Sequence, residues 1–324
     1  MTTDAATGGR ERTQPAGAAT TSAPTKRKKL RRLTRRDKVV LSLMVAIPTL
    51  IEALLVWLPA AGSIALSFTK WDGIDLGGIK SNGIQNYKYI FTDYPQFWPA
   101  VEHNILWLVF LSVIATPLGL LFAVLLDRRI RGSKIYQTAF FLPVMLSLAL
   151  VSIIWELMYD RQSGLINNML GTAGSNSGVD WLGNPHINIW SALIATTWRH
   201  SGYIMILYLA GLRGVDPSLR EAAALDGATE WQTFWRVVFP AMRPINIVVV
   251  VITIIEALRA FDIVYVFNGG TNGLELLSAL VIQNLKGEGL DIGVGAALAT
   301  VLLVVSLIPI TLYLRRAFRK DFDA

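Results

Sequence analysis

The sequence predicts an all-α integral membrane protein with six transmembrane helices and both termini in the cytoplasm. Three observations lead to this prediction: an apolar composition, six long apolar segments and an uneven distribution of Lys and Arg. Of the 324 residues, 53% are hydrophobic and 16% are charged, whereas about 25% of an average soluble domain is charged. We therefore expect a bilayer, rather than water, to surround most of this chain.

Each of the six apolar segments is long enough to cross the hydrocarbon core, which takes about 20 residues. They cover approximately residues 39–68, 101–126, 135–158, 189–212, 245–267 and 292–314. The first segment follows a basic stretch, as a signal peptide does, but its apolar run is longer than the core of a signal peptide. We expect it to remain as the first membrane helix.

The basic residues predict the orientation, because Lys and Arg gather in short loops on the cytoplasmic side. With the N-terminus inside, 23 of the 30 Lys and Arg residues lie on the cytoplasmic side and five on the outer side. The basic N-terminal run then determines topology and faces anionic lipid, so we expect no nucleic-acid partner. The chain contains no Cys, which excludes disulfides and thiolate chemistry.

These observations predict five regions along the chain. They are a disordered basic cytoplasmic tail at 1–37, a first transmembrane helix at 38–69, an extracytoplasmic loop at 70–100, a transmembrane domain of five helices at 101–315 and a cytoplasmic tail at 316–324. The domain at 101–315 includes a cytoplasmic loop at 213–243, which is too long to be a simple connection.

The first half of this loop carries the signals of a short helix. Asp216 can cap its N-terminus, with Pro217 at the first helical position, and Gly227 can end it in a left-handed conformation. Ala222 to Ala224 would give this helix a smooth, narrow surface for a partner protein, and the carboxylates of Glu221 and Asp226 would offer charges for docking.

A second helix should follow directly. Thr229 and Gln232 have the spacing of a capping box, and Pro240 should end or bend the helix. Two short helices that meet at a turn would therefore protrude into the cytoplasm.

The same loop closely resembles that of the permeases of binding-protein-dependent ABC importers. Their loop has Glu-Ala-Ala, three residues, Gly, nine residues and then Ile-x-Leu-Pro. This chain has Glu221-Ala222-Ala223, Gly227 and Val237-Val238-Phe239-Pro240 at that spacing, so each departure keeps an apolar residue. The resemblance extends from about residue 40 onward and is greatest for sugar and glycerol-phosphate permeases, in stretches such as LPAAGSIALSF, NYKYIF, GLINNML, WLGNP and the pair Phe261-Asp262.

The resemblance implies a type I ABC importer transmembrane domain at 101–315, in a multi-pass protein of the bacterial cytoplasmic membrane. It implies ABC ATPase subunits as partners, a second and unlike permease, an extracytoplasmic solute-binding protein and a carbohydrate substrate. The residues that it assigns to ATPase coupling are Glu221, Ala222, Ala223, Asp226, Gly227 and Pro240.

The chain lacks the motifs of an enzyme. A P-loop requires a Gly-Lys pair, and the sequence contains none. We therefore expect ATP and Mg²⁺ to be bound by a partner chain and no cofactor by this one. His103, His186 and His200 lack the spacing of a metal site, and no Ser lies in a Gly-x-Ser-x-Gly elbow.

Charged residues inside the apolar segments are costly and usually face a cavity or a partner. Glu256, Arg259 and Asp262 are spaced so that Arg259 could bridge the two carboxylates on one helical face. They either line a translocation path or form a structural ion pair. Trp198 and Arg199 either contact a sugar in that path or pack between helices.

An ion-gradient-driven secondary transporter is the alternative, because it also combines several spans with buried charges. That alternative leaves the Glu-Ala-Ala loop without an explanation. The sequence does not reveal which sugar is carried, since selectivity would depend largely on the separate binding protein.

Overall fold

The computed structural model describes residues 34–128, 131–174, 178–286 and 290–322. The chain divides into two compact units, Met1–Leu55 and Val56–Ala324. Of the predicted basic tail at 1–37, residues 1–33 lie outside the described part, as do residues 323 and 324 of the predicted tail at 316–324.

The first unit contains helix α1 (Arg35–Glu52). A capping box begins it, because the Thr34 hydroxyl accepts a hydrogen bond from the Asp37 N–H at 3.2 Å and the Asp37 carboxylate accepts one from the Thr34 N–H at 3.0 Å. The last residues of the predicted tail are therefore helical. The helix continues through the π-helical turn η1 (Ala53–Trp57) into α2 (Leu58–Leu66), and the run is long and apolar enough to span a membrane.

The predicted loop at 70–100 contains short elements of its own. They are strands β1 (Thr69–Lys70) and β2 (Lys80–Ser81), which pair antiparallel, the 3-10 turn η2 (Leu76–Gly78) and helix α3 (Gln85–Thr92). Asn86 ties α3 to the end of α2, because its side-chain amide donates hydrogen bonds to the carbonyls of Ser67 at 2.9 Å and Thr69 at 2.8 Å.

The second apolar segment forms one long helical run. It comprises α4 (Phe97–Phe110), η3 (Leu111–Ala115) and α5 (Thr116–Asp127). This run, the first run and residues Ile292–Arg315 are the three in the described part that are long and apolar enough to cross a membrane.

The prediction of one continuous helix at 135–158 is wrong. The segment forms α6 (Ser133–Met145) and α7 (Leu148–Tyr159), which are bent by 102° at their junction. Leu146 and Ser147 are extended there, and the Ser147 hydroxyl caps α7 by accepting a hydrogen bond from the Leu150 N–H at 3.2 Å. If α6 and α7 together cross the membrane once, they form a fourth candidate span.

The remaining elements follow in chain order. They are α8 (Leu165–Met169), α9 (Asn188–Gly214), α10 (Pro217–Leu225), α11 (Glu230–Thr233), η4 (Phe234–Val238), α12 (Phe239–Ala241), α13 (Arg243–Leu258), α14 (Asp262–Asn268), α15 (Leu277–Lys286) and α16 (Ile292–Phe322). The predicted helix at 245–267 is thus interrupted between α13 and α14.

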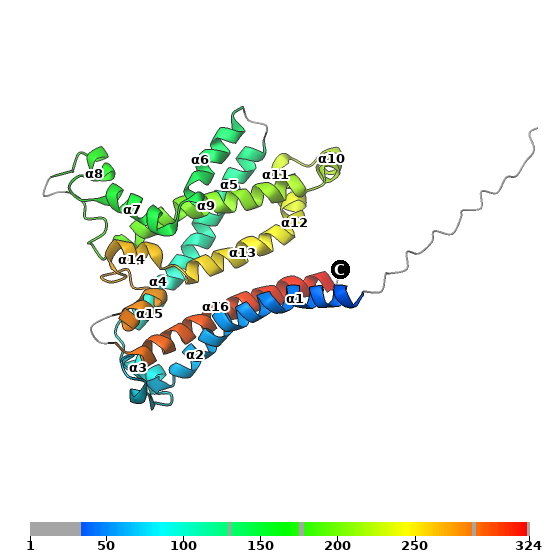
Figure 1. Ribbon diagram of the computed structural model, residues 1–324. Coiled ribbons are helices and arrows are strands. Elements are labelled where there is room, and N and C mark those ends of the chain that lie inside the picture. Colours follow the sequence, from blue (N-terminus) through cyan, green and yellow to red (C-terminus); the bar gives the residue numbers. More distant parts are fainter. Residues whose placement is uncertain (1–33, 129–130, 175–177, 287–289, 323–324) are drawn as a thin grey trace, which may run out of the picture. The chain divides into compact units, whose positions relative to one another are not determined.

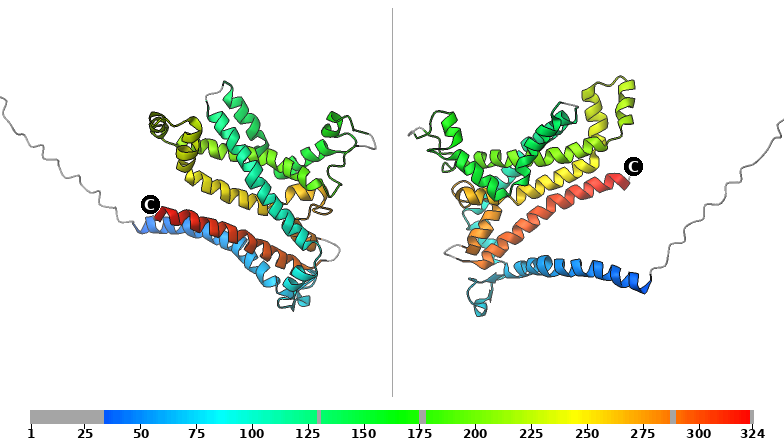
Figure 2. Two further views of the ribbon diagram at one scale, coloured as in Figure 1. Left: turned by 180° about the vertical axis from the view of Figure 1, so that it is seen from behind. Right: turned by 45° about the horizontal axis from the view of Figure 1, so that its top comes forward.

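Helix α9 organises the second unit. At about 1.5 Å per residue its 27 residues measure about 40 Å, long enough to span, although polar residues in its middle make it less apolar than the candidate spans. Helices α7, α8 and α14 lie near one of its ends and α10 and α11 near the other, as Figures 1 and 2 both show. Six crossings with both termini inside remain a prediction.

Small residues let α9 approach its neighbours closely. A Cβ at Gly202 of α9 would lie 2.1 Å from the carbonyl oxygen of Phe140 in α6, and a Cβ at Gly119 of α5 would lie 2.7 Å from the carbonyl oxygen of Ser201 in α9. Glycine at such crossings is typical of helices packed in membranes. A buried cluster that includes Ala123, Ile204 and Tyr208 extends this contact.

Two further clusters complete the interior of the second unit. One is built around Trp107, Leu193 and Phe267, and the other around Ile90, Phe97 and Leu298. Elsewhere most apolar residues face outward. Only 22% of the most apolar stretch of Phe97–Asp127 is buried, and only 11% of that of Ile292–Arg315. Exposure on this scale suits helices surrounded by lipid or by a partner subunit.

The three π-helical turns of the described residues share a position relative to proline. The turns η1, η3 and η4 end two residues before Pro59, Pro117 and Pro240. Proline has no N–H and its ring collides with the carbonyl of the residue four positions earlier. A wider turn accommodates that collision: the N–H of Thr116 bonds to the Leu111 carbonyl, and that of Phe239 to the Phe234 carbonyl, five residues back in each case.

Candidate functional site

The predicted cytoplasmic loop starts as its sequence indicates. Asp216 caps α10, with Pro217 in the first turn, and its carboxylate accepts a hydrogen bond from the Ser218 N–H at 2.9 Å. This bond holds the pKa of Asp216 below its usual range, because it stabilises the charged form. The carboxylate therefore caps the helix at neutral pH.

Gly227 ends α10 in the predicted left-handed conformation, with φ of 76°. The Ala228 N–H bonds to the Ala223 carbonyl at 3.0 Å and the Gly227 N–H bonds to the Ala224 carbonyl at 3.1 Å. This pair of bonds is a Schellman motif, which satisfies the last carbonyls of a helix and turns the chain sharply.

The second helix of the loop also forms as predicted. The Thr229 hydroxyl accepts from the Gln232 N–H at 3.3 Å and the Gln232 side chain accepts from the Thr229 N–H at 2.9 Å, so the capping box is complete. The helical run that begins at Glu230 passes through η4 and ends at Ala241, one residue after Pro240.

The turn between the two helices is exposed. The side chains of Glu221, Ala222 and Asp226 are exposed, as predicted for a docking surface, whereas Ala223 is buried. Because Ala223 is buried, its place in the predicted smooth outer surface is wrong. Two apolar side chains beside this turn are also exposed, Leu225 at 90% and Trp231 at 71%, and neither was among the predicted docking residues.

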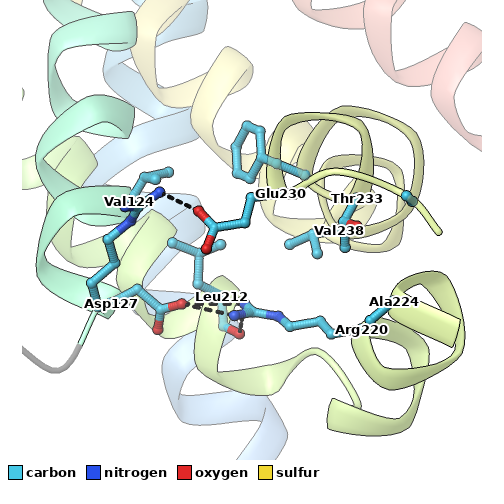
Figure 3. Close-up of a pocket in the computed structure, with 11 residues that line it drawn as sticks. Val124, Asp127, Leu212, Arg220, Ala224, Glu230, Thr233 and Val238 are labelled. Atoms are coloured by element: carbon cyan, nitrogen blue, oxygen red, sulfur yellow. Dashed lines mark hydrogen bonds and ion pairs between the residues drawn. The ribbon is translucent and has the colours of Figure 1, made fainter.

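Arg220 fixes α10 to the ends of two long helices (Figure 3). Both terminal nitrogens of its guanidinium donate to the Asp127 carboxylate of α5 at 3.2 Å, and Nη2 also donates to the Leu212 carbonyl of α9 at 3.3 Å. A second ion pair joins Arg128 to Glu230 at 2.8 Å. The loop is therefore held on α5 and α9 from both of its helices.

A pocket of about 330 Å³ lies between the loop and these helices. Figure 3 shows Arg220 and Asp127 on one side of it and Glu230 on another. Most of its remaining wall is apolar and includes Val124, Phe234 and Val238. The arrangement gives the loop a defined position on the bundle, so that a displacement of the loop would be passed to α5 and α9.

The residues predicted for a translocation path are only partly brought together. Helix α13 ends at Leu258 and Arg259 lies in its cap, so Glu256, Arg259 and Asp262 do not share one helical face. The ion pairs of the described residues do not include Arg259. The predicted bridge from Arg259 to the two carboxylates is therefore wrong. The i, i+3 spacing places side chains on one face only within a continuous helix, and α13 ends before Arg259.

Trp198 and Arg199 lie in the middle of α9. Trp198 contacts Trp155 of α7 edge to face, with ring centroids 6.0 Å apart. The Nε of Arg199 is buried and has no hydrogen-bond partner among the described residues. Nearby on the same helix, His200 lies 3.4 Å from the Thr253 hydroxyl, which lies 3.1 Å from that of Thr116. Polar groups from α5, α9 and α13 thus meet inside the bundle.

The pairing of Arg220 with Asp127 and of Arg128 with Glu230 was not predicted from the sequence. The positions of the charged residues in the sequence could not reveal these pairs, because 93 residues separate Asp127 from Arg220. The one available signal was that Arg220 directly precedes the Glu-Ala-Ala sequence. Among the described residues, His, Asp and Glu side chains form no group of three that could hold a metal ion.

The chain matches the family model described as "Binding-protein-dependent transport system inner membrane component" over residues 115–323. It is 31% identical over 313 residues to the xylose/arabinose import permease protein XacH of Haloferax volcanii, covering 96% of this chain and 98% of that one. It is also 32% identical to the osmoprotective compounds uptake permease protein GgtC of Synechocystis sp., covering 81% and 92%.

A solved structure has the same fold. It is that of a bacterial ABC transporter involved in the import of the acidic polysaccharide alginate. The similarity has a TM-score of 0.74 with 22% identity and covers 88% of this chain and 96% of that chain. The mostly helical fold of a type I ABC importer permease, predicted from the sequence, is confirmed by this comparison.

Proposed function

The chain belongs to the family of binding-protein-dependent transport system inner membrane components, and on that premise we propose how it works. It is the membrane-spanning permease of an ATP-driven importer. The loop at 213–243 docks on a separate ATPase subunit through the exposed turn between α10 and α11. Closure of the ATPase pair then moves that turn and reorients the helices to which it is fixed.

The observation that carries this proposal is the way in which the loop is held. Its turn projects Glu221, Asp226 and Leu225 away from the bundle, while Arg220 behind it bonds to α5 and α9. A loop built to dock should expose a rigid surface on one side and be anchored on the other. The capping box and the Schellman motif supply the rigidity.

In the membrane we propose six crossings with both termini inside the cell. The pair α6–α7 and the interrupted run α13–α14 are two of the crossings, and a second, unlike permease covers the outward apolar faces. The distribution of Lys and Arg supports this orientation. Bent and interrupted helices are tolerated in a membrane where neighbouring protein satisfies their polar groups.

The proposed substrate is a sugar or a related polyol, delivered by an extracytoplasmic binding protein. The name of the relative from Haloferax volcanii, which matches nearly the whole chain, supports a sugar. Trp198 offers a partly exposed aromatic face and Arg199 a guanidinium nitrogen without a partner among the described residues. These two groups, with Glu256, Arg259 and Asp262, are our candidates for the translocation path.

A detergent pull-down of the tagged chain from its native membrane tests the proposal, with the co-purifying proteins identified and their ATPase activity assayed. We expect an ATPase and a second permease, and we expect the ATPase to be lost when Glu221 and Gly227 are changed together. A chain that purifies without ATPase would favour transport driven by an ion gradient instead.

Replacing Arg220 with Met tests how the loop is anchored. Met keeps the apolar stem but removes the bonds to Asp127 and to the Leu212 carbonyl, so we expect ATPase retention and uptake to fall by about fivefold, as for a loss of about 1 kcal/mol. The expected loss is modest because 41% of the Arg220 side chain is exposed and water screens its charge.

Arg128→Met is the matched control, because its ion pair with Glu230 is more exposed, at 63% and 86% for the two side chains. It should have a smaller effect. A double variant that exchanges the two charges, Arg220→Asp with Asp127→Arg, should recover part of the ATPase retention and uptake that Arg220→Met loses. If the exchange is no better than Arg220→Met alone, the ion pair does not anchor the loop.

A further inference from the structure

A second pocket, of about 770 Å³, lies where α5 ends, α6 begins and α9 ends. Four basic side chains line it, those of Arg128, Arg131, Lys134 and Arg213. The carboxylate that lines it belongs to Asp127, whose charge is already bonded to Arg220. The pocket therefore carries an excess of positive charge that α5, α6 and α9 bring together.

Three of these cations have no partner within the described chain. The Arg128 side chain bonds to Glu230, but the charged groups of Arg131, Lys134 and Arg213 form no hydrogen bond or ion pair among the described residues, and all three residues are exposed. The first turn of α6 adds to the positive potential, because Gly132 at its N-cap provides no side-chain acceptor and the Ser133 hydroxyl donates instead to the Leu126 carbonyl at 3.2 Å. An anion placed here would find several donors.

Exposed, largely apolar side chains that lie close to these cations in the sequence indicate what kind of anion fits. Leu125 on α5 is 45% exposed, and Ile135 and Tyr136 in the first turn of α6 are 74% and 52% exposed. A free phosphate would leave these side chains in contact with water. A phospholipid would place its phosphate among the cations and its acyl chain along the apolar residues.

We propose that this pocket binds the phosphate headgroup of an anionic phospholipid in the cytoplasmic leaflet. The inference rests on the proposed function only in placing the end of α5 at the cytoplasmic surface of the membrane. Basic pockets between membrane helices bind such headgroups. The site differs from the pocket beneath the loop at 213–243 but adjoins it, because Asp127 and Arg128 line both pockets.

The adjoining wall gives the lipid a way to influence the loop at 213–243. A phosphate in the pocket attracts Arg128, which otherwise bonds to Glu230 in the first turn of α11. The bound headgroup and Glu230 thus compete for one guanidinium. The lipid adjusts how firmly the second helix of the loop is held, while the Arg220 anchor remains.

The test compares lipid retained by the full chain after purification from membranes of mixed anionic and zwitterionic lipid, measured by mass spectrometry. For the wild type we expect anionic lipid to be enriched. In a variant with Arg131, Lys134 and Arg213 all changed to Gln, the enrichment should fall about tenfold or more, since each cation near the surface contributes appreciably. The variant with Arg131→Lys and Arg213→Lys should keep most of the enrichment, because the positive charge remains.

A variant with Arg35, Arg36 and Lys38 all changed to Gln is the matched control, since it loses the same charge at the start of α1. It should retain the lipid. Equal loss in both triple variants would overturn the proposal in favour of general surface charge. A second measurement compares the thermal unfolding midpoint of the purified chain with inorganic phosphate and with anionic vesicles. If inorganic phosphate alone raises the midpoint as much as the vesicles do, the pocket binds free phosphate and the proposal of a lipid is overturned. Neither readout needs the ATPase, so failure here is distinguishable from failure of the proposed function.

Discussion

Gly227→Val should abolish the retention of the ATPase and reduce uptake by about tenfold or more. A Cβ at Gly227 would have no atom within 4 Å, so crowding is not the cause. The cause is the backbone, since φ of 76° is left-handed and a side chain there costs about 1–2 kcal/mol. A branched side chain such as Val fits this region least well. The Schellman bonds should then open and redirect α11.

A graded series separates this explanation from a general disturbance. Asn tolerates the left-handed region better than other residues with side chains, so Gly227→Asn should retain most of the docking, Gly227→Ala less and Gly227→Val least. The measurements are ATPase co-purification and uptake, at equal amounts of inserted protein.

Gly171 provides the matched control. Its φ is 70° and a Cβ there would also have no atom within 4 Å, but it follows α8 and lies outside the loop at 213–243. Gly171→Val should carry the same backbone strain and still retain the ATPase. Wild-type docking and uptake in Gly227→Val, or an equal loss in Gly171→Val, would contradict the role of this turn.

Gly202→Ala should destabilise the bundle by about 2–3 kcal/mol, the cost of overpacking a tight helix crossing. The new methyl group would lie 2.1 Å from the Phe140 carbonyl oxygen, which belongs to a helix backbone and cannot rotate away. Helices α6 and α9 would have to separate. We expect a clear fall in the thermal unfolding midpoint in detergent and less folded protein in the membrane.

The same substitution at the end of the same helix should have no such effect. A Cβ at Gly214 would have no atom within 4 Å, and Ala is the better helix former. Gly214→Ala should therefore leave the unfolding midpoint unchanged or slightly raised. If both variants lose the same stability, the close approach at Gly202 does not explain the effect.

The loop at 213–243 could be predicted well because its signals are local. Asp216, the pair Thr229 and Gln232, and Gly227 each act within a few residues, so the sequence alone indicated where both helices begin and where the first one ends. The burial of a side chain, in contrast, depends on which other parts of the folded chain pack against it. The exposed Glu221-Ala222 and the buried Ala223 therefore could not be distinguished from composition.

The shapes of the apolar segments, unlike those of the loop helices, could not be predicted from the sequence. An apolar run indicates that a stretch can lie in a bilayer, but it does not reveal where the helix axis bends. The 102° bend after Met145 and the interruption after Leu258 both fall inside such runs. The pairing of Arg220 with Asp127 was hidden for a related reason, since it depends on how α5 and α9 pack.

The turn η3 also fixes the helical phase of α5. A π-helical turn holds about one residue more than an α-helical turn, and each residue advances an α-helix by about 100°. Gly119 and Ala123, which follow η3, face α9 only because that extra residue precedes them. The number of residues before Pro117 thus determines the contact as much as the glycine does, so a one-residue deletion there would turn a different face of α5 toward its neighbour.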